Sequence, residues 1–393
     1  MKWTDEHHAF RSSVETFVAR EINPYADQWE EEGAFPAHKV FKAAGKIGLL
    51  GITKPIEYGG ADLDFSFTVV MAEALAKSRS AGVSLALGVQ TDMCTPALSA
   101  YGSDELKTEF LSPSITGDRV GCIGVSEAGG GSDVAALKTH ARVVGDDYVI
   151  NGHKMWITNG AQADWMCALV NTSEGPAHRN KSLIIIPMDS HGVHVEKKLD
   201  KMGMRASDTA IIHFDEVKVP RRHLVGDREG EGFKQQMSQF QDERLWGAAN
   251  AVAMMEEALR ITVEYAQQRY TFGQALISNQ VIQHRLAELS TEIQALKALT
   301  YRAVELHMEY GGMNMEVVRF ASMAKLKAGR LSREVLDTCV QYHGGMGYVT
   351  ESLINRMYRD VRVLSIGGGA DEVMLGQLAK REGFVPLQAG AKS

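Results

Sequence analysis

Residues 141–158 read ARVVGDDYVINGHKMWIT, and this stretch decides the fold class. Runs rich in β-branched residues alternate there with turn residues, which is typical of strands joined by tight turns. The Asn151-Gly152 dipeptide between two such runs predicts a β-hairpin. Further strand-like runs occupy residues 165–170, 183–186, 193–195 and 210–214. Close spacing without intervening helices predicts an antiparallel sandwich or barrel rather than βαβ units.

On both sides of this β region the hydrophobic period becomes helical. Before it, Ala9, Val14 and Phe17 recur at helical spacing, and Pro24 is expected to end that helix. After it come three long helical stripes and a shorter helix at 371–381, which indicate a bundle. We therefore expect an α+β, mostly α protein in three parts. These are an N-terminal α-helical domain (1–118), a middle β domain (119–228) and a C-terminal four-helix bundle (229–393).

Composition excludes several classes of protein. The chain of 393 residues has 45% hydrophobic and 23% charged residues, which is ordinary for a globular protein. Its net charge of −7 is a poor match to nucleic acid or an anionic membrane, and no apolar run is long enough to span a bilayer. The cysteines are too far apart for a zinc ribbon or a redox pair: Cys94, Cys122, Cys167 and Cys339.

Several common motifs are absent as well. The chain contains no GxGxxG, no GxxxxGK[ST] and no HExxH, so we expect neither a Rossmann dinucleotide site, nor a P-loop, nor a metal. The N-terminal octet MKWTDEHH has acidic residues and no apolar segment typical of a signal peptide. We expect a cytoplasmic location, or the mitochondrial matrix if a transit peptide has been removed.

Two neighbouring segments carry residues suited to chemistry. GVSEAGGGSDV (124–134) combines a strand end with three glycines and two serines, and KMWITNG (154–160) places Trp156 two residues before Thr158. Glycines let backbone N–H groups approach a ligand closely. Alternation along a strand predicts that Trp156 and Thr158 share one face, which suits a flat heteroaromatic ligand. On local grounds alone, the glycines are more often a flexible loop, and a packed tryptophan is as good an interpretation as a ligand contact.

Longer segments of the sequence resemble those of a known protein family. GVSEAGGGSDVAALKT, GHKMWITNGAQADW, YAQQRYTFGQALISNQ, QYHGGMGY and YRDVRVLSIGGGADEVM resemble, in order and spacing, the acyl-CoA dehydrogenase family. The resemblance covers essentially the whole chain. It implies a helical domain, a β domain and a four-helix bundle, which agrees with the pattern above. It also implies bound FAD, an acyl-CoA substrate, a homotetramer, and electron-transfer flavoprotein as electron acceptor.

The family motifs assign cofactor roles by position. Ser126, Trp156 and Thr158 are expected to contact the isoalloxazine ring, and Ser132 to lie near the CoA portion. A second set is expected to hold the pyrophosphate and adenine of FAD across a subunit contact: Arg269, Phe272, Gln280, Gln341 and Gly345. An arginine suits an anionic pyrophosphate because charge-assisted hydrogen bonds are strong.

The catalytic base is expected at an unusual position. Many family members place a glutamate in the C-terminal segment, but Gly368 stands there in this chain. The segment QDERL (241–245) resembles the isovaleryl-CoA dehydrogenase branch, in which the glutamate before the arginine is the base. Glu243 therefore inherits that role. Gly368 would still offer its backbone N–H to the thioester carbonyl. Arg244 continues an apolar stripe, so we expect it to be buried and to need a partner or ligand.

The resulting expectation is FAD-dependent oxidation of an acyl-CoA at Cα–Cβ to the trans-2-enoyl-CoA. The segments FDEVKVP and IGGGADEVML add a resemblance to citronellyl-CoA dehydrogenase, which implies a methyl-branched or medium-to-long acyl chain. Two alternatives stay open at this stage. One is a flavin oxidase or monooxygenase on the same scaffold. The other is a non-catalytic protein that binds flavin or CoA, which the missing side chain at Gly368 favours.

Overall fold

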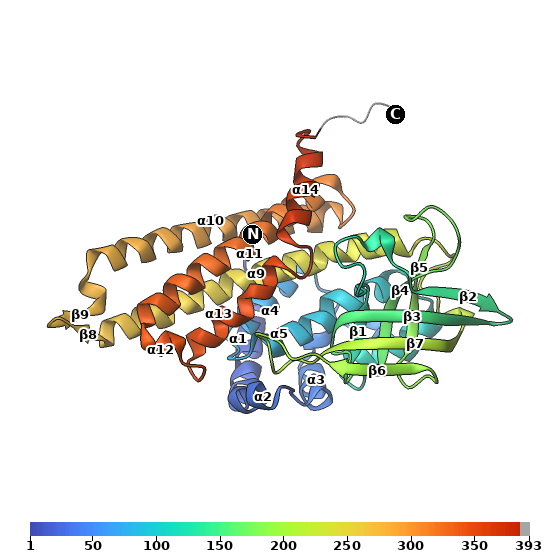
Figure 1. Cartoon of the computed structure of the whole chain (residues 1–393), viewed down its shortest axis with the longest axis horizontal. Helices are drawn as coiled ribbons and strands as arrows, with labels where there is room; N and C mark the ends of the chain where they lie inside the picture. Colours follow the sequence, from blue (N-terminus) through green and yellow to red (C-terminus); the bar gives the residue numbers. More distant parts are fainter. Residues whose placement is uncertain (386–393) are drawn as a thin grey trace.

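The computed structural model describes residues 1–385 and has three regions in chain order, as the sequence predicts (Figure 1). Residues 386–393 of the predicted C-terminal domain lie outside the described residues. The N-terminal region is helical: α1 (Asp5–Phe17), η1 (Val18–Ile22), α2 (Ala26–Glu32), α3 (Ala37–Lys46), η2 (Leu49–Gly51), α4 (Phe65–Leu75), α5 (Ala81–Gly88), η4 (Val89–Cys94), α6 (Pro96–Tyr101), α7 (Asp104–Leu106), η5 (Lys107–Leu111) and α8 (Ser112–Ile115). The first helix ends before Pro24, as expected.

The middle region is one curled sheet of seven strands. Its strands are β1 (Gly121–Gly124), β2 (His140–Val144), β3 (Asp147–Thr158), β4 (Trp165–Asn171), β5 (Lys181–Pro187), β6 (Val193–Lys198) and β7 (Thr209–Pro220). The spatial order is β1-β4-β2-β3-β7-β6, and β5 pairs with β4. The expectation of a purely antiparallel sheet was wrong at two pairings, because β4 pairs in parallel with β1 and, at one residue pair, with β2. The long segment between these strands gives the chain room for a parallel crossover.

The predicted Asn151-Gly152 hairpin was also wrong. β3 runs straight through this dipeptide, and the turn between β2 and β3 lies at Gly145 and Asp146. Gly152 instead sits at a bulge with φ of +140°, where a Cβ atom would lie 2.6 Å from the Thr139 hydroxyl oxygen. A glycine inside a strand often marks such a close approach of another backbone.

The C-terminal region is built on three long helices. These helices and the shorter elements around them are α9 (Gly232–Gln268), β8 (Tyr270–Thr271), β9 (Gln274–Ala275), α10 (Gln280–Tyr310), α11 (Met315–His343), α12 (Gly345–Tyr348), α13 (Leu353–Val361), η9 (Arg362–Ser365) and α14 (Asp371–Arg381). The expected short helix at 371–381 is α14. It stands across the long helices rather than along them (Figure 1), and the sequence patterns did not predict α13.

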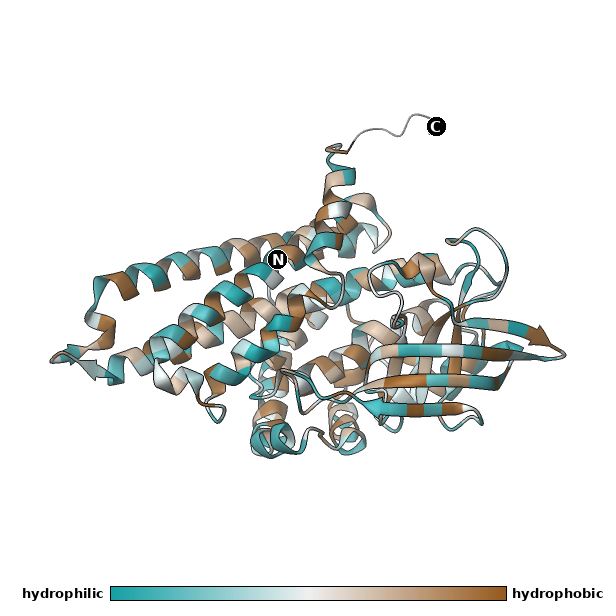
Figure 2. Ribbon diagram, viewed as in Figure 1, coloured by the Kyte–Doolittle hydropathy of each residue, from teal (hydrophilic) through white to brown (hydrophobic). Residues whose placement is uncertain are grey.

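Helix α9 connects the β domain to the bundle. Its first residue, Gly232, packs against Ser182 and Leu183 of β5, and Gln235 donates to the Val225 carbonyl at 3.1 Å. Further along, Leu245 and Trp246 join the same hydrophobic cluster as the N-terminal helices. Figure 2 shows hydrophobic and hydrophilic residues alternating along the long helices, the pattern of helices with one buried face. A side chain on α9 can therefore face all three regions.

Within residues 1–385, no helix combines the length and the apolar character that crossing a bilayer requires.

Candidate active site

Glu243 and Gly368 lie next to each other although 125 positions separate them in the chain. Glu243 is on α9, and Gly368 is in the segment between η9 and α14. A Cβ atom added at Gly368 would lie 2.8 Å from Oε1 of Glu243, so the carboxylate occupies the space that a side chain at 368 would need. The glycine also has φ of +63°, which disfavours other residues. The structure thus brings together the two residues to which the sequence assigned catalysis.

Gly368→Ala is therefore expected to disturb this pair. The added Cβ meets the carboxylate at 2.8 Å, and a positive φ costs an alanine about 1–2 kcal/mol. We expect the free energy of unfolding to fall by about that amount and turnover to fall further, because Glu243 must move. Gly367→Ala is the matched control for stability, since its Cβ would meet only Val363 at 3.6 Å. Full turnover in Gly368→Ala would show that the carboxylate does not act from this place.

Burial and two charged neighbours shift the pKa of Glu243 in opposite directions. Burial raises the pKa of this half-buried carboxyl, while Arg244 and Lys325 oppose that rise. Lys325 is buried on α11 and donates a hydrogen bond to the Gly369 carbonyl, and burial lowers its pKa to about 8. The sequence patterns gave Lys325 no role. Its position directly after the apolar stripe residue Ala324 was the available signal.

Arg244 is buried, as its stripe predicts. Its guanidinium donates to Gln241 at 3.2 Å and lies 5.9 Å from the centre of the Phe240 ring. Burial lowers the pKa of Arg244 to about 10. Among residues 1–385 no carboxylate lies within 4.0 Å of it, and its Nε atom is buried without a hydrogen-bond partner. A buried cation with spare donors beside Glu243 is suited to an electron-rich group on a ligand.

The expected flavin-ring residues also come together. The Ser126 carbonyl, just beyond β1, accepts a hydrogen bond from the Met155 N–H of β3 at 2.9 Å. A bulge between Lys154 and Ile157 interrupts the alternation that predicted a shared face for Trp156 and Thr158. Trp156 has φ of +67° and is 58% exposed, and Thr158 is half-buried, with buried Ile157 between them. An open, flat indole in strained backbone is a feature associated with ligand sites.

A buried ion pair fixes these two segments to each other. The Lys154 ammonium donates to Glu127 at 2.9 Å and to the Leu169 carbonyl at 2.8 Å. The Glu127 carboxylate also accepts from the N–H groups of Lys138 and Thr139, so it closes the base of the glycine-rich loop. Burial opposes ionisation of Glu127, but Lys154 and these N–H groups hold the pKa of its carboxyl down at about 2. Both residues lie within the two motifs, but the motifs did not predict this role.

The glycine-rich loop itself is open. Ser132 is exposed, and a Cβ atom at Gly129 or Gly131 would have nothing within 4 Å. Such a loop leaves room for a ligand against its backbone. Together with the exposed indole, this chemistry fits the flavin end of FAD. Among the described residues, no group of three or more His, Cys, Asp or Glu side chains could hold a metal ion.

The expected nucleotide-binding residues lie at the other end of the bundle. All five are exposed: Arg269, Phe272, Gln280, Gln341 and Gly345. The ends of α9 and α11 meet there, where the rings of Tyr265 and His343 stack at 4.4 Å. Figure 1 shows β8, β9 and α12 at the end of the bundle away from the β domain. At about 1.5 Å per residue, α9 separates Arg269 from Glu243 by about 39 Å, so this set is not brought to the flavin-ring residues of the same chain.

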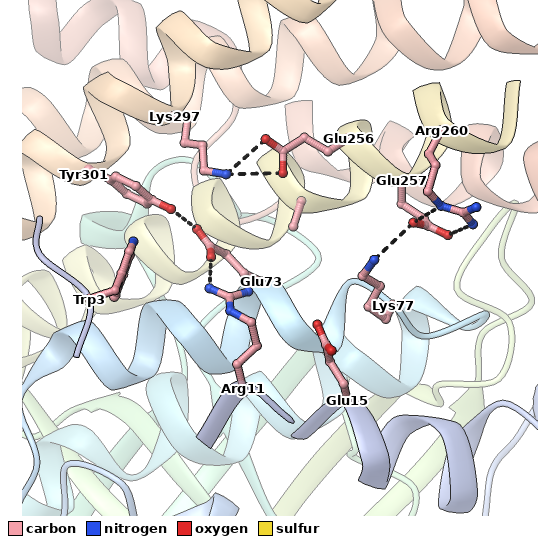
Figure 3. A pocket seen from close by; sticks show the side chains of 11 residues that line it. Trp3, Arg11, Glu15, Glu73, Lys77, Glu256, Glu257, Arg260, Lys297 and Tyr301 are labelled. Atoms are coloured by element: carbon pink, nitrogen blue, oxygen red, sulfur yellow. Dashed lines mark hydrogen bonds and ion pairs between the residues drawn. The ribbon is translucent and has the colours of Figure 1, made fainter. Parts of the chain in front are cut away.

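A surface cavity of about 440 Å³ between α1, α4, α9 and α10 is a poor rival site. Figure 3 shows that its charged groups mostly satisfy one another. Arg11 and Tyr301 both bond Glu73 at 2.5 Å, and Lys297 bonds Glu256 at 3.0 Å. A ligand would have to displace these pairs.

Comparison with known proteins shows the same three-domain organisation. Models of the N-terminal, middle and C-terminal domains of acyl-CoA dehydrogenases match residues 4–118, 122–217 and 230–383. The long-chain specific mitochondrial acyl-CoA dehydrogenase of Rattus norvegicus is 36% identical over 386 residues, covering 96% of this chain and 87% of that protein. The short-chain specific enzyme of the same species is 34% identical over 370 residues, covering 94% and 88%.

Solved structures extend the likeness to three dimensions. A crystal structure of a probable acyl-CoA dehydrogenase from Mycobacterium abscessus has 40% identity and a TM-score of 0.92, covering 96% of this chain and 99% of that one. The two curated relatives are named short-chain and long-chain enzymes, so they do not single out the isovaleryl- or citronellyl-like branch. Family models and enzymes of named activity match almost the entire chain, and the protein is an oxidoreductase that belongs to the acyl-CoA dehydrogenase family.

Proposed function

We propose that the protein binds FAD and oxidises the Cα–Cβ bond of an acyl-CoA thioester, with Glu243 as the catalytic base. The observation that carries this proposal is the contact between the Glu243 carboxylate and the site of the absent side chain at Gly368. The catalytic base is thus supplied by α9 instead of the segment around residue 368, but its carboxylate occupies the same region of the site. This argues against a non-catalytic protein, whose only support was the glycine at 368.

The residues of this chain suit the steps of that reaction. Glu243 takes the α-proton as the Cα–H electron pair moves into the new double bond. Bound FAD would accept the hydride that leaves Cβ. The Gly368 N–H makes no backbone hydrogen bond among residues 1–385, so it is free to donate to the thioester carbonyl. A donor aimed at developing negative charge in a closed site is worth about 3–4 kcal/mol.

The room beside Glu243 and the effect of a bound acyl chain on its pKa also support Glu243 as the base. Gly247 lies one turn after Glu243, and a Cβ atom there would have nothing within 4 Å, which leaves room for an acyl thioester. The acyl chain would exclude water and so raise the pKa of Glu243 further. A base with a pKa nearer neutrality is more effective at physiological pH.

The substrate and the acceptor belong to the same proposal. We favour a methyl-branched or medium-to-long acyl chain, because of the glutamate position and the segments FDEVKVP and IGGGADEVML. Electron-transfer flavoprotein is the proposed electron acceptor, and a homotetramer the proposed assembly, both from the family resemblance.

Anaerobic titration of the purified flavoprotein tests this function. Straight, branched and terpenoid acyl-CoA thioesters are each added, and bleaching of the flavin absorbance is followed. We expect at least one thioester to bleach the flavin and to yield the 2-enoyl-CoA. Rapid aerobic turnover with peroxide release would favour an oxidase instead. Bound flavin that no thioester bleaches would support a non-catalytic protein.

The separation of the two FAD-binding sets predicts a site shared between chains. Trp156→Ala and Arg269→Ala are each expected to lose FAD on their own, because each damages every site. The Trp156→Ala chain keeps Arg269, and the Arg269→Ala chain keeps Trp156. In a two-fold symmetric dimer with one chain of each variant, one of the two sites therefore has both intact residues. Co-expression should therefore restore flavin absorbance to the mixed protein. No recovery in verified mixed oligomers would place both sets in the site of one chain.

A further inference from the structure

Four polar side chains gather beside the candidate active site and have no role in the mechanism above. Lys54 follows η2, Asp92 is on η4, Asp242 is on α9 and His307 is on α10. Lys54 and Asp92 are each only 3% exposed. Four separate parts of the chain therefore contribute one polar group each to this place in the helical part of the protein. We refer to these four residues as the polar cluster.

The packing of α9 explains why they meet. Gln239 accepts from the Ala97 N–H at 2.8 Å, just beyond η4. On the same face of α9, the Trp246 ring would lie 2.7 Å from a Cβ atom at Gly88, the residue before η4. Asp242 lies between these two contacts at helical spacing, so its side chain faces η4 and Asp92.

The cluster is incompletely satisfied. Asp242 bonds the Nε2 atom of His307 at 2.7 Å, and the Thr91 hydroxyl bonds Asp92 at 2.5 Å. The Lys54 ammonium has no hydrogen bond and no ion pair within 4.0 Å in the described part of the chain. The Nδ1 atom of His307 is also buried without a partner. A buried ammonium without a partner is costly, so such a group usually awaits a ligand or ordered water.

The charged groups of the cluster shift one another's pKa values. Burial lowers the pKa of Lys54, and the carboxylates of Asp92 and Asp242 act against that shift. Burial raises the pKa of Asp92 to about 7, which Lys54 opposes. The charges of the cluster therefore act on one another, although no carboxylate in the described part of the chain lies within 4.0 Å of the Lys54 ammonium. A small group with both a donor and an acceptor would bridge them.

The cluster also lies beside the candidate base on α9. Asp242 directly precedes Glu243, so their side chains leave α9 about 100° apart around its axis. As part of this inference, we place the acyl chain of a thioester, whose α-carbon lies at Glu243, along α9. A chain that follows the neighbouring face of α9 meets Asp242, with Lys54 and Asp92 around it.

We infer that the polar cluster binds a hydroxyl group carried on the acyl chain, so that hydroxylated acyl-CoA thioesters are the preferred substrates. This inference rests on the proposed function and names its substrate class. A hydroxyl accepts from the Lys54 ammonium and donates to Asp92 or Asp242 at once. A carboxylate on the acyl chain would be repelled by the carboxylates of Asp92 and Asp242. A ketone could not donate a hydrogen bond to either of them, and an unsubstituted hydrocarbon chain would leave the Lys54 ammonium without a partner.

The test compares matched thioesters on the flavin-loaded enzyme. The panel is a series of hydroxyacyl-CoA thioesters that differ in which carbon of the acyl chain carries the hydroxyl. Each is compared with its parent acyl-CoA and with the corresponding ω-carboxyacyl-CoA. We expect kcat/KM to favour one hydroxylated position over its parent by about tenfold or more. In Lys54→Met and in Asp92→Asn that ratio should fall towards one. Lys46→Met, which removes an exposed lysine outside the cluster, should keep the ratio.

A binding measurement separates recognition from turnover. The Glu243→Gln variant holds thioesters without oxidising them, and flavin spectral perturbation should show tighter binding of the favoured hydroxyacyl-CoA than of its parent. Equal affinity and equal kcat/KM for every matched pair would overturn the inference while leaving the proposed function intact. So would variants of Lys54 and Asp92 that are folded but keep the preference. If no thioester of any kind bleaches the wild-type flavin, the proposed function fails and the inference fails with it.

Discussion

Replacement of Glu243 by glutamine is expected to lower kcat by about 10²–10⁴-fold, the usual contribution of a general base. The amide keeps the shape of the carboxylate but cannot take the α-proton. Glutamine also removes a half-buried charge, so the protein should fold and keep its flavin. Stopped-flow anaerobic reduction with the best thioester from the substrate panel measures the effect directly, because it isolates the oxidation step.

A matched control lies on the same helix. Glu256 is partly exposed and pairs with Lys297 in the surface cavity of Figure 3, and exposed pairs contribute about 1 kcal/mol or less. Glu256→Gln should keep the wild-type reduction rate. Comparable reduction by wild type and Glu243→Gln would remove Glu243 from the mechanism and direct attention to another acid.

The pH profile offers a second check on Glu243. The base must be ionised to act, and burial raises the pKa of this carboxyl above its ordinary value of 4.5. The rate of flavin reduction should therefore rise with pH through an apparent pKa above 4.5, and Glu243→Gln should abolish that limb. A limb that persists in the variant would belong to a different group.

Lys154→Met is expected to lower the free energy of unfolding by about 3–5 kcal/mol, since it leaves the Glu127 carboxylate buried without its cation. Glu127 closes the base of the glycine-rich loop and Lys154 lies two residues before Trp156, so the flavin-ring residues should lose their relative positions. Urea unfolding measures the stability. FAD titration of the apoprotein should show weakened flavin binding even at low temperature, where the variant remains folded.

Two further variants identify the cause. Lys154→Met combined with Glu127→Gln removes the stranded charge, so it should cost less than the sum of the single changes. Lys42→Met breaks the exposed pair with Asp118 and should change stability by less than about 1 kcal/mol. If Lys154→Met lowers the free energy of unfolding no more than Lys42→Met does, the buried Lys154–Glu127 pair does not hold the glycine-rich loop in place.

Periodicity predicted the order of the regions because it reports which faces are buried. The alternation in residues 141–158 located the β domain, and the stripes of α9, α10 and α11 located the bundle. Local turn chemistry was less reliable. The Asn151-Gly152 signal marked a bulge rather than a turn, because the approach of Thr139 and the pairing with β7 outweighed the intrinsic preference of the dipeptide.

The sequence by itself determined the family, the three-part architecture and the candidate base, because these depend on residue type and spacing along the chain. Only the tertiary structure decided what meets across the chain. It placed the Glu243 carboxylate against Gly368, closed the glycine-rich loop with the Glu127–Lys154 pair, and paired Asp242 of α9 with His307 of α10. The physical reason is that burial and charge pairing depend on distances between elements, and helix or strand periodicity contains no information about those distances.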